Sequence, residues 1–142
     1  MNADDFQRIT DVSRETLKQF QLYADLLEKW QKSINLVSKS SLSDKWRRHF
    51  YDSAQLIDYI NKDTKPLKIL DLGSGAGFPG LVISLLGAGE VHLVEAVGKK
   101  CSFMKQVIQK TGMNAIVHNL RIEQMNAFSV DLITSRACAD LD

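Results

Sequence analysis

The sequence contains few cysteines and no long hydrophobic run. Its two cysteines, Cys101 and Cys138, lie far apart in the chain and form no CxxC motif, so we expect two reduced thiols and neither a disulfide framework nor a metal site. The longest apolar stretch, residues 80–88, is shorter than the roughly 20 residues that a membrane-spanning helix needs. The N-terminus is acidic and lacks a signal-peptide pattern. These absences predict a cytoplasmic protein without a membrane segment.

A strong charge of either sign is also absent. The net charge is +1, and this balance neither predicts nor excludes a nucleic-acid partner, because a local basic patch is what binds phosphates. Apolar residues make up 44% and charged residues 25% of the 142 residues, a composition typical of a folded globular protein. The length fits one folded unit.

Helical periodicity characterises the first part of the chain. Over residues 13–30 the apolar side chains recur every three or four positions, which predicts an amphipathic helix capped by Ser13. A second helix is predicted from residue 43 or 44 to residue 60. The polar residues 61–66 end in proline and mark a boundary, so we predict an N-terminal helical extension over residues 1–62.

The pattern changes to short apolar runs alternating with helical segments from residue 63 onward. The four predicted strands are residues 67–72, 91–95, 115–118 and 130–134, with helices over residues 79–86 and 99–111. Repetition of strand, helix and strand predicts right-handed crossovers and a parallel sheet with helices on both faces. The predicted fold class is therefore α/β, a Rossmann-like part over residues 63–142 that follows the helical extension.

A glycine-rich segment, Asp71-Leu-Gly-Ser-Gly-Ala-Gly77, follows the first predicted strand and precedes a helix. Glycines at such a turn let the backbone approach a ligand closely, so Gly73, Gly75 and Gly77 indicate a nucleotide site. The spacing alone is a weak indication, because a flexible turn has the same composition. Glu95 strengthens it, because an acid at the end of the second strand can accept hydrogen bonds from both ribose hydroxyls.

Two cofactors fit this pattern, a nicotinamide dinucleotide and S-adenosyl-L-methionine. Asp71 adds negative charge just before the first glycine, which would repel a pyrophosphate and attract a sulfonium and an ammonium group. Phe78 and Pro79 crowd the amide cluster that a diphosphate normally uses. These residues favour S-adenosyl-L-methionine and leave a dinucleotide-dependent oxidoreductase as the alternative.

Several stretches along the chain form a specific combination. They are Trp30-Gln-Lys-Ser-Ile-Asn-Leu36, Arg48-His-Phe-Tyr-Asp-Ser53, Asp71-Leu-Gly-Ser-Gly-Ala-Gly-Phe-Pro-Gly80, Gly98-Lys-Lys with Phe103, and Ser135-Arg-Ala137. Together they resemble the RsmG (GidB) family, the methyltransferases that modify guanine N7 in 16S ribosomal RNA. The resemblance implies an enzyme that binds S-adenosyl-L-methionine, acts on 16S ribosomal RNA or the small ribosomal subunit, holds no metal and is a monomer when full length.

The resemblance also implies particular site residues. It places Glu123 near the adenine of the cofactor and Arg136 in the cleft beside the methyl donor; without it, both could also be surface charges. With the glycine loop included, the predicted cofactor-binding residues are Asp71, Gly73, Ser74, Gly75, Gly77, Phe78, Glu95, Ile122, Glu123 and Arg136. Arg121 and Arg136 are the catalytic candidates. A general base is not required, because guanine N7 carries a free lone pair.

Basic residues near the expected cleft are candidates for RNA contacts. They are Lys45, Arg47, Arg48, Lys99, Lys100, Arg121 and Arg136, and a solvated helix face is the alternative explanation for each lysine. His49 and Asp52 share a helix face, which predicts either a hydrogen bond between them or a contact with the substrate.

Two features depart from the family pattern. Glu95 stands where the family has aspartate, which lengthens the reach to the ribose and keeps the acceptor. Members of the family also continue further and complete a seven-stranded sheet, so we expect a C-terminally truncated chain whose fourth strand has an unpaired edge. A folded but inactive cofactor-binding fragment is therefore a further alternative.

Overall fold

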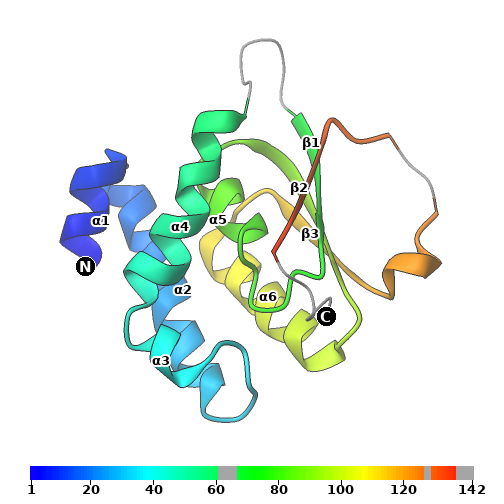
Figure 1. Cartoon of the computed structure of the whole chain (residues 1–142), viewed down its shortest axis with the longest axis horizontal. Helices are drawn as coiled ribbons and strands as arrows, with labels where there is room; N and C mark the ends of the chain where they lie inside the picture. The colour runs from blue at the N-terminus through cyan, green and yellow to red at the C-terminus, as the bar shows by residue number, and fades with distance from the viewer. Residues whose placement is uncertain (61–66, 127–128, 137–142) are drawn as a thin grey trace.

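A layer of helices packs against a four-stranded sheet (Figure 1). The structure is a computed structural model, and it describes residues 1–60, 67–126 and 129–136. The predicted boundary between residues 62 and 63 lies outside the described residues.

Two helices open the chain. α1 (Ala3–Thr10) is absent from the sequence prediction, because Phe6 is its one buried residue and a single apolar contact produces no periodic pattern. α2 (Arg14–Gln31) confirms the predicted helix over residues 13–30, and the Ser13 side chain accepts a hydrogen bond from the Thr16 N–H at its start.

The second predicted helix, over residues 43–60, is wrong as a regular α-helix. After the short α3 (Lys39–Leu42), the chain forms a π-helical turn, η1 (Trp46–Tyr51), then α4 (Asp52–Ala54) and a 3-10 turn, η2 (Gln55–Tyr59). In the wider π turn, His49 and Phe50 are both buried although they are adjacent in sequence. Tertiary packing of the aromatic core around Phe50 therefore overrides the regular helical period.

The sheet is fully parallel and has the strand order β3-β2-β1-β4. Its strands are β1 (Leu67–Leu72), β2 (Gly89–Glu95), β3 (Ala115–Asn119) and β4 (Leu132–Ser135). All four predicted strands are confirmed, with boundaries shifted by two residues or fewer. β1 lies at the centre, so the glycine-rich segment that follows it emerges between β2 and β4.

The helices α5 (Gly80–Leu85) and α6 (Gly98–Thr111) connect the first three strands and pack on one face of the sheet. α2 packs in turn on α5 and α6. The prediction of helices on both faces is wrong for the described residues, in which the long helices lie on one side of the sheet (Figure 1). The physical reason is the connection from β3 to β4, whose described part contains only the 3-10 turn η3 (Ile122–Gln124).

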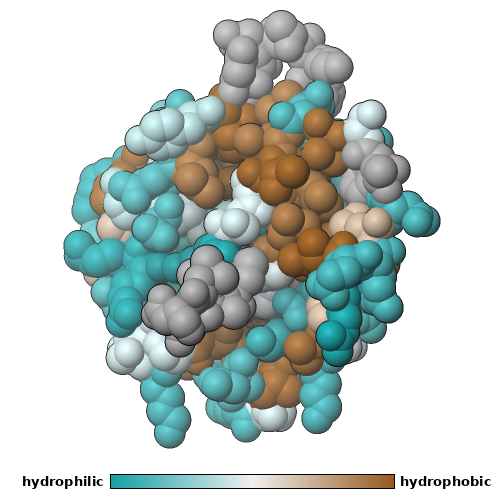
Figure 2. Space-filling model, turned by 45° about the vertical axis from the view of Figure 1, so that its right-hand side comes forward, coloured by the Kyte–Doolittle hydropathy of each residue, from teal (hydrophilic) through white to brown (hydrophobic). Residues whose placement is uncertain are grey.

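The other face of the sheet presents apolar side chains to solvent. Figure 2, which turns the right-hand side of Figure 1 forward, shows brown apolar residues gathered on it. Ile116 on β3 is 44% exposed and Ile133 on β4 is 58% exposed. No helix among the described residues has the length and apolar character needed to cross a membrane.

Candidate functional site

The loop after β1 has a backbone that only glycine adopts easily. Gly73, Gly75 and Gly77 have φ angles of 63°, 56° and 94°, in the left-handed region. At Gly77 a Cβ atom would also lie 2.7 Å from the Tyr23 hydroxyl oxygen, so the loop packs tightly on α2. The loop is therefore held in one conformation, with its amides beside the end of β2.

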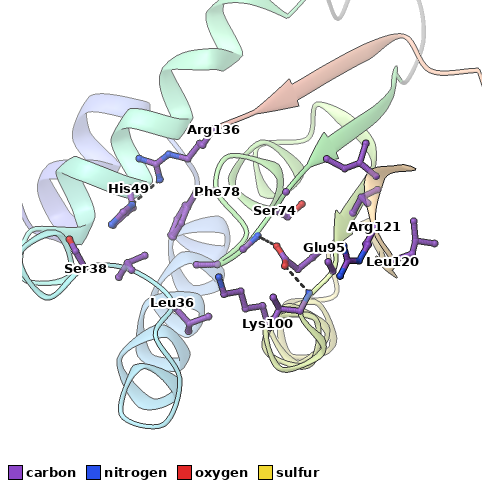
Figure 3. A pocket seen from close by; sticks show the side chains of 18 of the residues that line it. Leu36, Ser38, His49, Ser74, Phe78, Glu95, Lys100, Leu120, Arg121 and Arg136 are labelled. Carbon is purple, nitrogen blue, oxygen red and sulfur yellow. Dashed lines mark hydrogen bonds between the residues drawn. The ribbon is translucent and has the colours of Figure 1, made fainter. Parts of the chain in front are cut away.

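Glu95, the last residue of β2, closes this loop. Its carboxylate accepts hydrogen bonds from the Gly75 N–H at 2.7 Å and from the Val97 N–H at 2.9 Å (Figure 3). The parallel register pairs Leu72 with Val94, which brings Glu95 level with the start of the loop. Each carboxylate oxygen has a second lone pair, so Glu95 can still accept hydrogen bonds from a ligand.

Aromatic rings pack against the glycine loop. Phe78 stacks on Tyr23 and on His49, with ring centroids 5.3 and 4.8 Å apart. The Tyr23 hydroxyl donates a hydrogen bond of 2.6 Å to the Ala76 carbonyl oxygen inside the protein. Complete burial raises the pKa of Tyr23 well above its ordinary value, so this hydroxyl remains a donor.

Arg136, just after β4, joins the sheet to the helical extension. Its Nη1 lies 2.9 Å from His49 Nδ1 (Figure 3). Its Nη2 lies 3.3 Å from the Arg48 carbonyl oxygen and 3.6 Å from Asp52 Oδ2. The predicted hydrogen bond between His49 and Asp52 is wrong, because the guanidinium lies between them. Arginine can only donate, so His49 Nδ1 is the acceptor and the neutral ring carries its proton on Nε2.

Burial and positive neighbours keep His49 uncharged. Burial, followed by the charges of Arg136 and Arg48, lowers the pKa of His49 to about 4 against the opposing effect of Asp52. At neutral pH this end of the site therefore has the charge of the guanidinium, balanced in part by the Asp52 carboxylate.

These groups border an open cavity of about 810 Å³, a volume suited to a nucleoside-sized ligand. It lies between the helical extension and the carboxyl ends of β1 and β2 (Figure 3). Eight of the predicted cofactor-binding residues line it, namely Gly73, Ser74, Gly75, Phe78, Glu95, Ile122, Glu123 and Arg136. Arg121 lines it as well.

Asp71 and Gly77, also predicted as cofactor contacts, do not line the cavity. The Asp71 side chain is fully buried beneath the loop, and its Oδ1 accepts a hydrogen bond of 2.7 Å from the Thr134 hydroxyl of β4. Burial raises the pKa of Asp71 to about 6, although the hydrogen bond from Thr134 opposes this shift. The expectation that its charge faces the cofactor is corrected: Asp71 links β1 to β4 under the loop.

The cavity also has a wall that the sequence did not predict. It comes from the connection after α2 and from α3, and its members are Leu36, Val37, Ser38 and Ser41. Leu36 lies inside one of the motifs that resemble the RsmG (GidB) family, and this motif is the feature of the sequence from which the wall could have been predicted. Lys100, at the start of α6, was predicted as an RNA contact and lines the same cavity. No group of three or more His, Cys, Asp or Glu side chains within the described ranges is placed to hold a metal ion.

Comparison with solved structures identifies the class of fold. A mutant of MtNAS in complex with S-adenosylmethionine superposes with a TM-score of 0.58, at 17% identity, over 99% of this chain and 59% of that chain. A protein-L-isoaspartate O-methyltransferase superposes with a TM-score of 0.56, at 18% identity, over 94% of this chain and 47% of that chain. The fold is the Rossmann-like fold of S-adenosylmethionine-dependent methyltransferases.

Sequence comparison identifies the family. Residues 16–142 match the family GidB, rRNA small subunit methyltransferase G. The ribosomal RNA small subunit methyltransferase G of Rhodospirillum rubrum is 50% identical over 141 residues, which are 99% of this chain and 69% of the relative. That of Rhodospirillum centenum is 51% identical over 139 residues, 98% of this chain and 63% of the relative. The chain belongs to the GidB family, and membership in a methyltransferase family decides for S-adenosylmethionine over a dinucleotide.

Proposed function

We propose that this chain transfers the methyl group of S-adenosylmethionine to N7 of a guanine in 16S ribosomal RNA. The substrate would be this RNA within the small ribosomal subunit. The observation that carries the proposal is the pairing of the Glu95 carboxylate with the Gly75 amide at the rim of the cavity. A carboxylate and a close-packed glycine backbone fit the ribose and the adjoining chain of this cofactor. A ribosomal substrate places the reaction in the cytoplasm.

Different residues of the cavity would contact different parts of the cofactor. Glu95 would accept hydrogen bonds from the ribose hydroxyls, and Ile122 and Glu123 would border the adenine. Phe78 and Arg136 line the cavity on the side away from Leu120 and Arg121 (Figure 3), where the methionine chain and the methyl group would lie. This division supports the predicted contact set apart from Asp71 and Gly77.

The chemistry requires positioning more than proton transfer. When bound, the cofactor would supply an electrophilic methyl group; guanine N7 would take it with its free lone pair as the methyl–sulfur bond breaks, which would leave S-adenosylhomocysteine. The protein must align the reacting atoms and exclude water, which together lower the barrier without a general base. Arg121 and Arg136 cannot be deprotonated in a protein, so we propose that both act by positioning.

The structure sorts the basic residues that were predicted to contact RNA. Lys45 lies 3.1 Å from Glu28, and Arg47 lies 3.8 Å from Asp44, so both are partly neutralised. The residues Arg48, Lys100, Arg121 and Arg136 line the cofactor cavity and place positive charge around its opening, although the charge of Arg136 is balanced in part by Asp52. They support an approach of the RNA backbone to this opening.

Methyl transfer tests the proposal. Small ribosomal subunits that lack the modification are incubated with the protein and with cofactor labelled in its methyl group, and the RNA is then digested to nucleosides. The expected product is labelled 7-methylguanosine. Label that enters only a small metabolite would overturn the proposal. A variant with Glu95→Ala serves as the control for cofactor-dependent transfer.

The alternative candidate is a unit that binds the cofactor without methyl transfer. The chain spans 63–69% of the length of the relatives compared above. Titration calorimetry with S-adenosylhomocysteine separates the two candidates: binding without methyl transfer supports the alternative, and binding with transfer supports the enzyme. Absence of binding would contradict both.

A further inference from the structure

A second cavity, of about 600 Å³, lies on the other side of Arg136. Arg136 lines both cavities, and the adjacent residues Phe78 and Pro79 line the first and the second respectively. The second cavity is formed by η1, α4 and η2, the end of α1 and the end of β4. The two cavities are therefore neighbours that share the guanidinium as a common wall.

The side chains of the second cavity suit a flat polar ring better than a phosphate. Asp52 and Asp58 contribute two carboxylates, and Arg136 is the positively charged residue among the described residues that line it. Tyr59 stands at the rim with 85% of its surface exposed, which makes its ring available for stacking on a base. Two carboxylates against one guanidinium, with an exposed aromatic ring, favour a nucleobase over a phosphate.

Asp52 is the carboxylate next to the cofactor cavity. Its Oδ2 lies 3.6 Å from Arg136 Nη2, and its side chain remains 59% exposed. The ion pair restricts the carboxylate, and the exposure leaves room for a ligand. The Watson–Crick edge of guanine presents two parallel donors, N1–H and the N2 amino group, which a carboxylate can accept together. Adenine presents an acceptor at N1, which a carboxylate repels.

We propose that the second cavity binds a guanine base of the RNA substrate and that Asp52 accepts the N1–H and N2–H hydrogen bonds. The inference rests on the proposed function, because it assigns a base of the RNA substrate to the second cavity. Binding through this edge leaves N7 of the base free. Because Arg136 is the wall shared by the two cavities, its side chain would have to move aside for N7 to reach a methyl group held in the first cavity.

Nucleotide binding tests this assignment without methyl transfer. The protein is saturated with S-adenosylhomocysteine and titrated with GMP, IMP or AMP, and binding is followed by NMR chemical shifts. We expect GMP to bind about tenfold more tightly than AMP. IMP should lie between them, because it keeps N1–H and lacks the N2 amino group. The same affinity for all three nucleotides, or no saturable binding, would overturn the proposal.

Three variants separate recognition from a structural effect. Asp52→Asn should reduce the GMP preference to within about twofold, because the amide cannot accept both hydrogen bonds. Asp52→Glu keeps the carboxylate and should keep a preference for GMP. Asp25→Asn is the control, since it removes an exposed carboxylate of α2 that lines neither cavity, and it should behave as the unmodified protein. An equal loss of preference in Asp25→Asn would contradict the assignment to Asp52.

The cofactor affinity distinguishes this inference from the proposed function. Unchanged S-adenosylhomocysteine binding by Asp52→Asn shows that the fold and the first cavity are intact. If the protein methylates ribosomal RNA and its GMP preference does not depend on Asp52, this inference alone fails. If the GMP preference depends on Asp52 and no RNA is methylated, the proposed function alone fails.

Discussion

The Glu95 carboxylate and the Gly75 amide are joined by a hydrogen bond of 2.7 Å that connects the end of β2 to the loop after β1. The two residues are 20 positions apart in the chain. This bond orders the glycine loop and places the carboxylate at the rim of the cavity before a ligand binds.

Replacing Glu95 by alanine should weaken binding of S-adenosylhomocysteine about 10- to 100-fold, because hydrogen bonds to a charged acceptor are lost. Glu95→Asp should bind more tightly than Glu95→Ala, since it keeps the acceptor. Calorimetry measures both affinities. Glu90→Gln is the control, because Glu90 lies on the same strand and contacts His92 outside the cavity lining. A similar loss in Glu90→Gln would show that the effect is not specific to the site.

Replacing Tyr23 by phenylalanine should lower the free energy of unfolding by about 1–3 kcal/mol, because the buried Ala76 carbonyl loses its 2.6 Å hydrogen bond. Chemical denaturation measures the loss. Tyr59→Phe is the matched control, since Tyr59 is 85% exposed, and its free energy of unfolding should change little. Equal stability of the Tyr23 and Tyr59 variants would contradict this account of the loop.

Asp71 should make the protein less stable as the pH rises. Its folded pKa of about 6 lies above its ordinary value of 3.8, so the folded state binds more protons than the unfolded state between these values. Stability from this group is greatest below pH 4, falls up to about pH 6 and is level above. Asp71→Asn removes this effect, so its stability relative to the unmodified protein should rise by about 2 kcal/mol between pH 4 and pH 6. An unchanged difference in stability between pH 4 and pH 6 would contradict it.

His49 should have the opposite effect in nearly the same pH window. Its folded pKa of about 4 lies below its ordinary value of 6.5, so the unfolded state binds more protons and stability rises with pH between these values. The two groups therefore oppose each other in the unmodified protein. His49→Gln should remove this contribution, so its stability relative to the unmodified protein should fall as the pH rises from about 4 to 6.5, as denaturation at a series of pH values would show. An unchanged difference in stability across these pH values would contradict the assignment.

The exposed face of the sheet should promote association at high concentration, because Ile133 is 58% exposed on β4 and the described residues place no strand beyond it. Ile133→Lys should reduce this association, as sedimentation velocity would show. Ile9→Lys is the control, since Ile9 is also about half exposed but lies on α1. A clean monomer at high concentration before any substitution would contradict the prediction.

The amino-acid sequence alone determined the features that depend on neighbouring residues. The four strands follow from short apolar runs, and the start of α2 follows from the Ser13 cap. The glycine loop follows from three closely spaced glycines, because only their backbone adopts these φ angles easily. The place of Glu95 could also be predicted, since a residue that ends the strand beside β1 must lie next to that loop.

Only the tertiary structure decided the features that depend on distant residues. Arg136 and His49 are 87 positions apart, so no local pattern shows that the guanidinium takes the place of the predicted bond to Asp52. The neighbouring strand β4, 63 positions away, buries Asp71 through Thr134 and so removes its charge from the cavity. The π turn of η1 likewise follows from the aromatic core on which it packs. In each case packing between separate elements, and not the preference of one segment, sets which atoms meet.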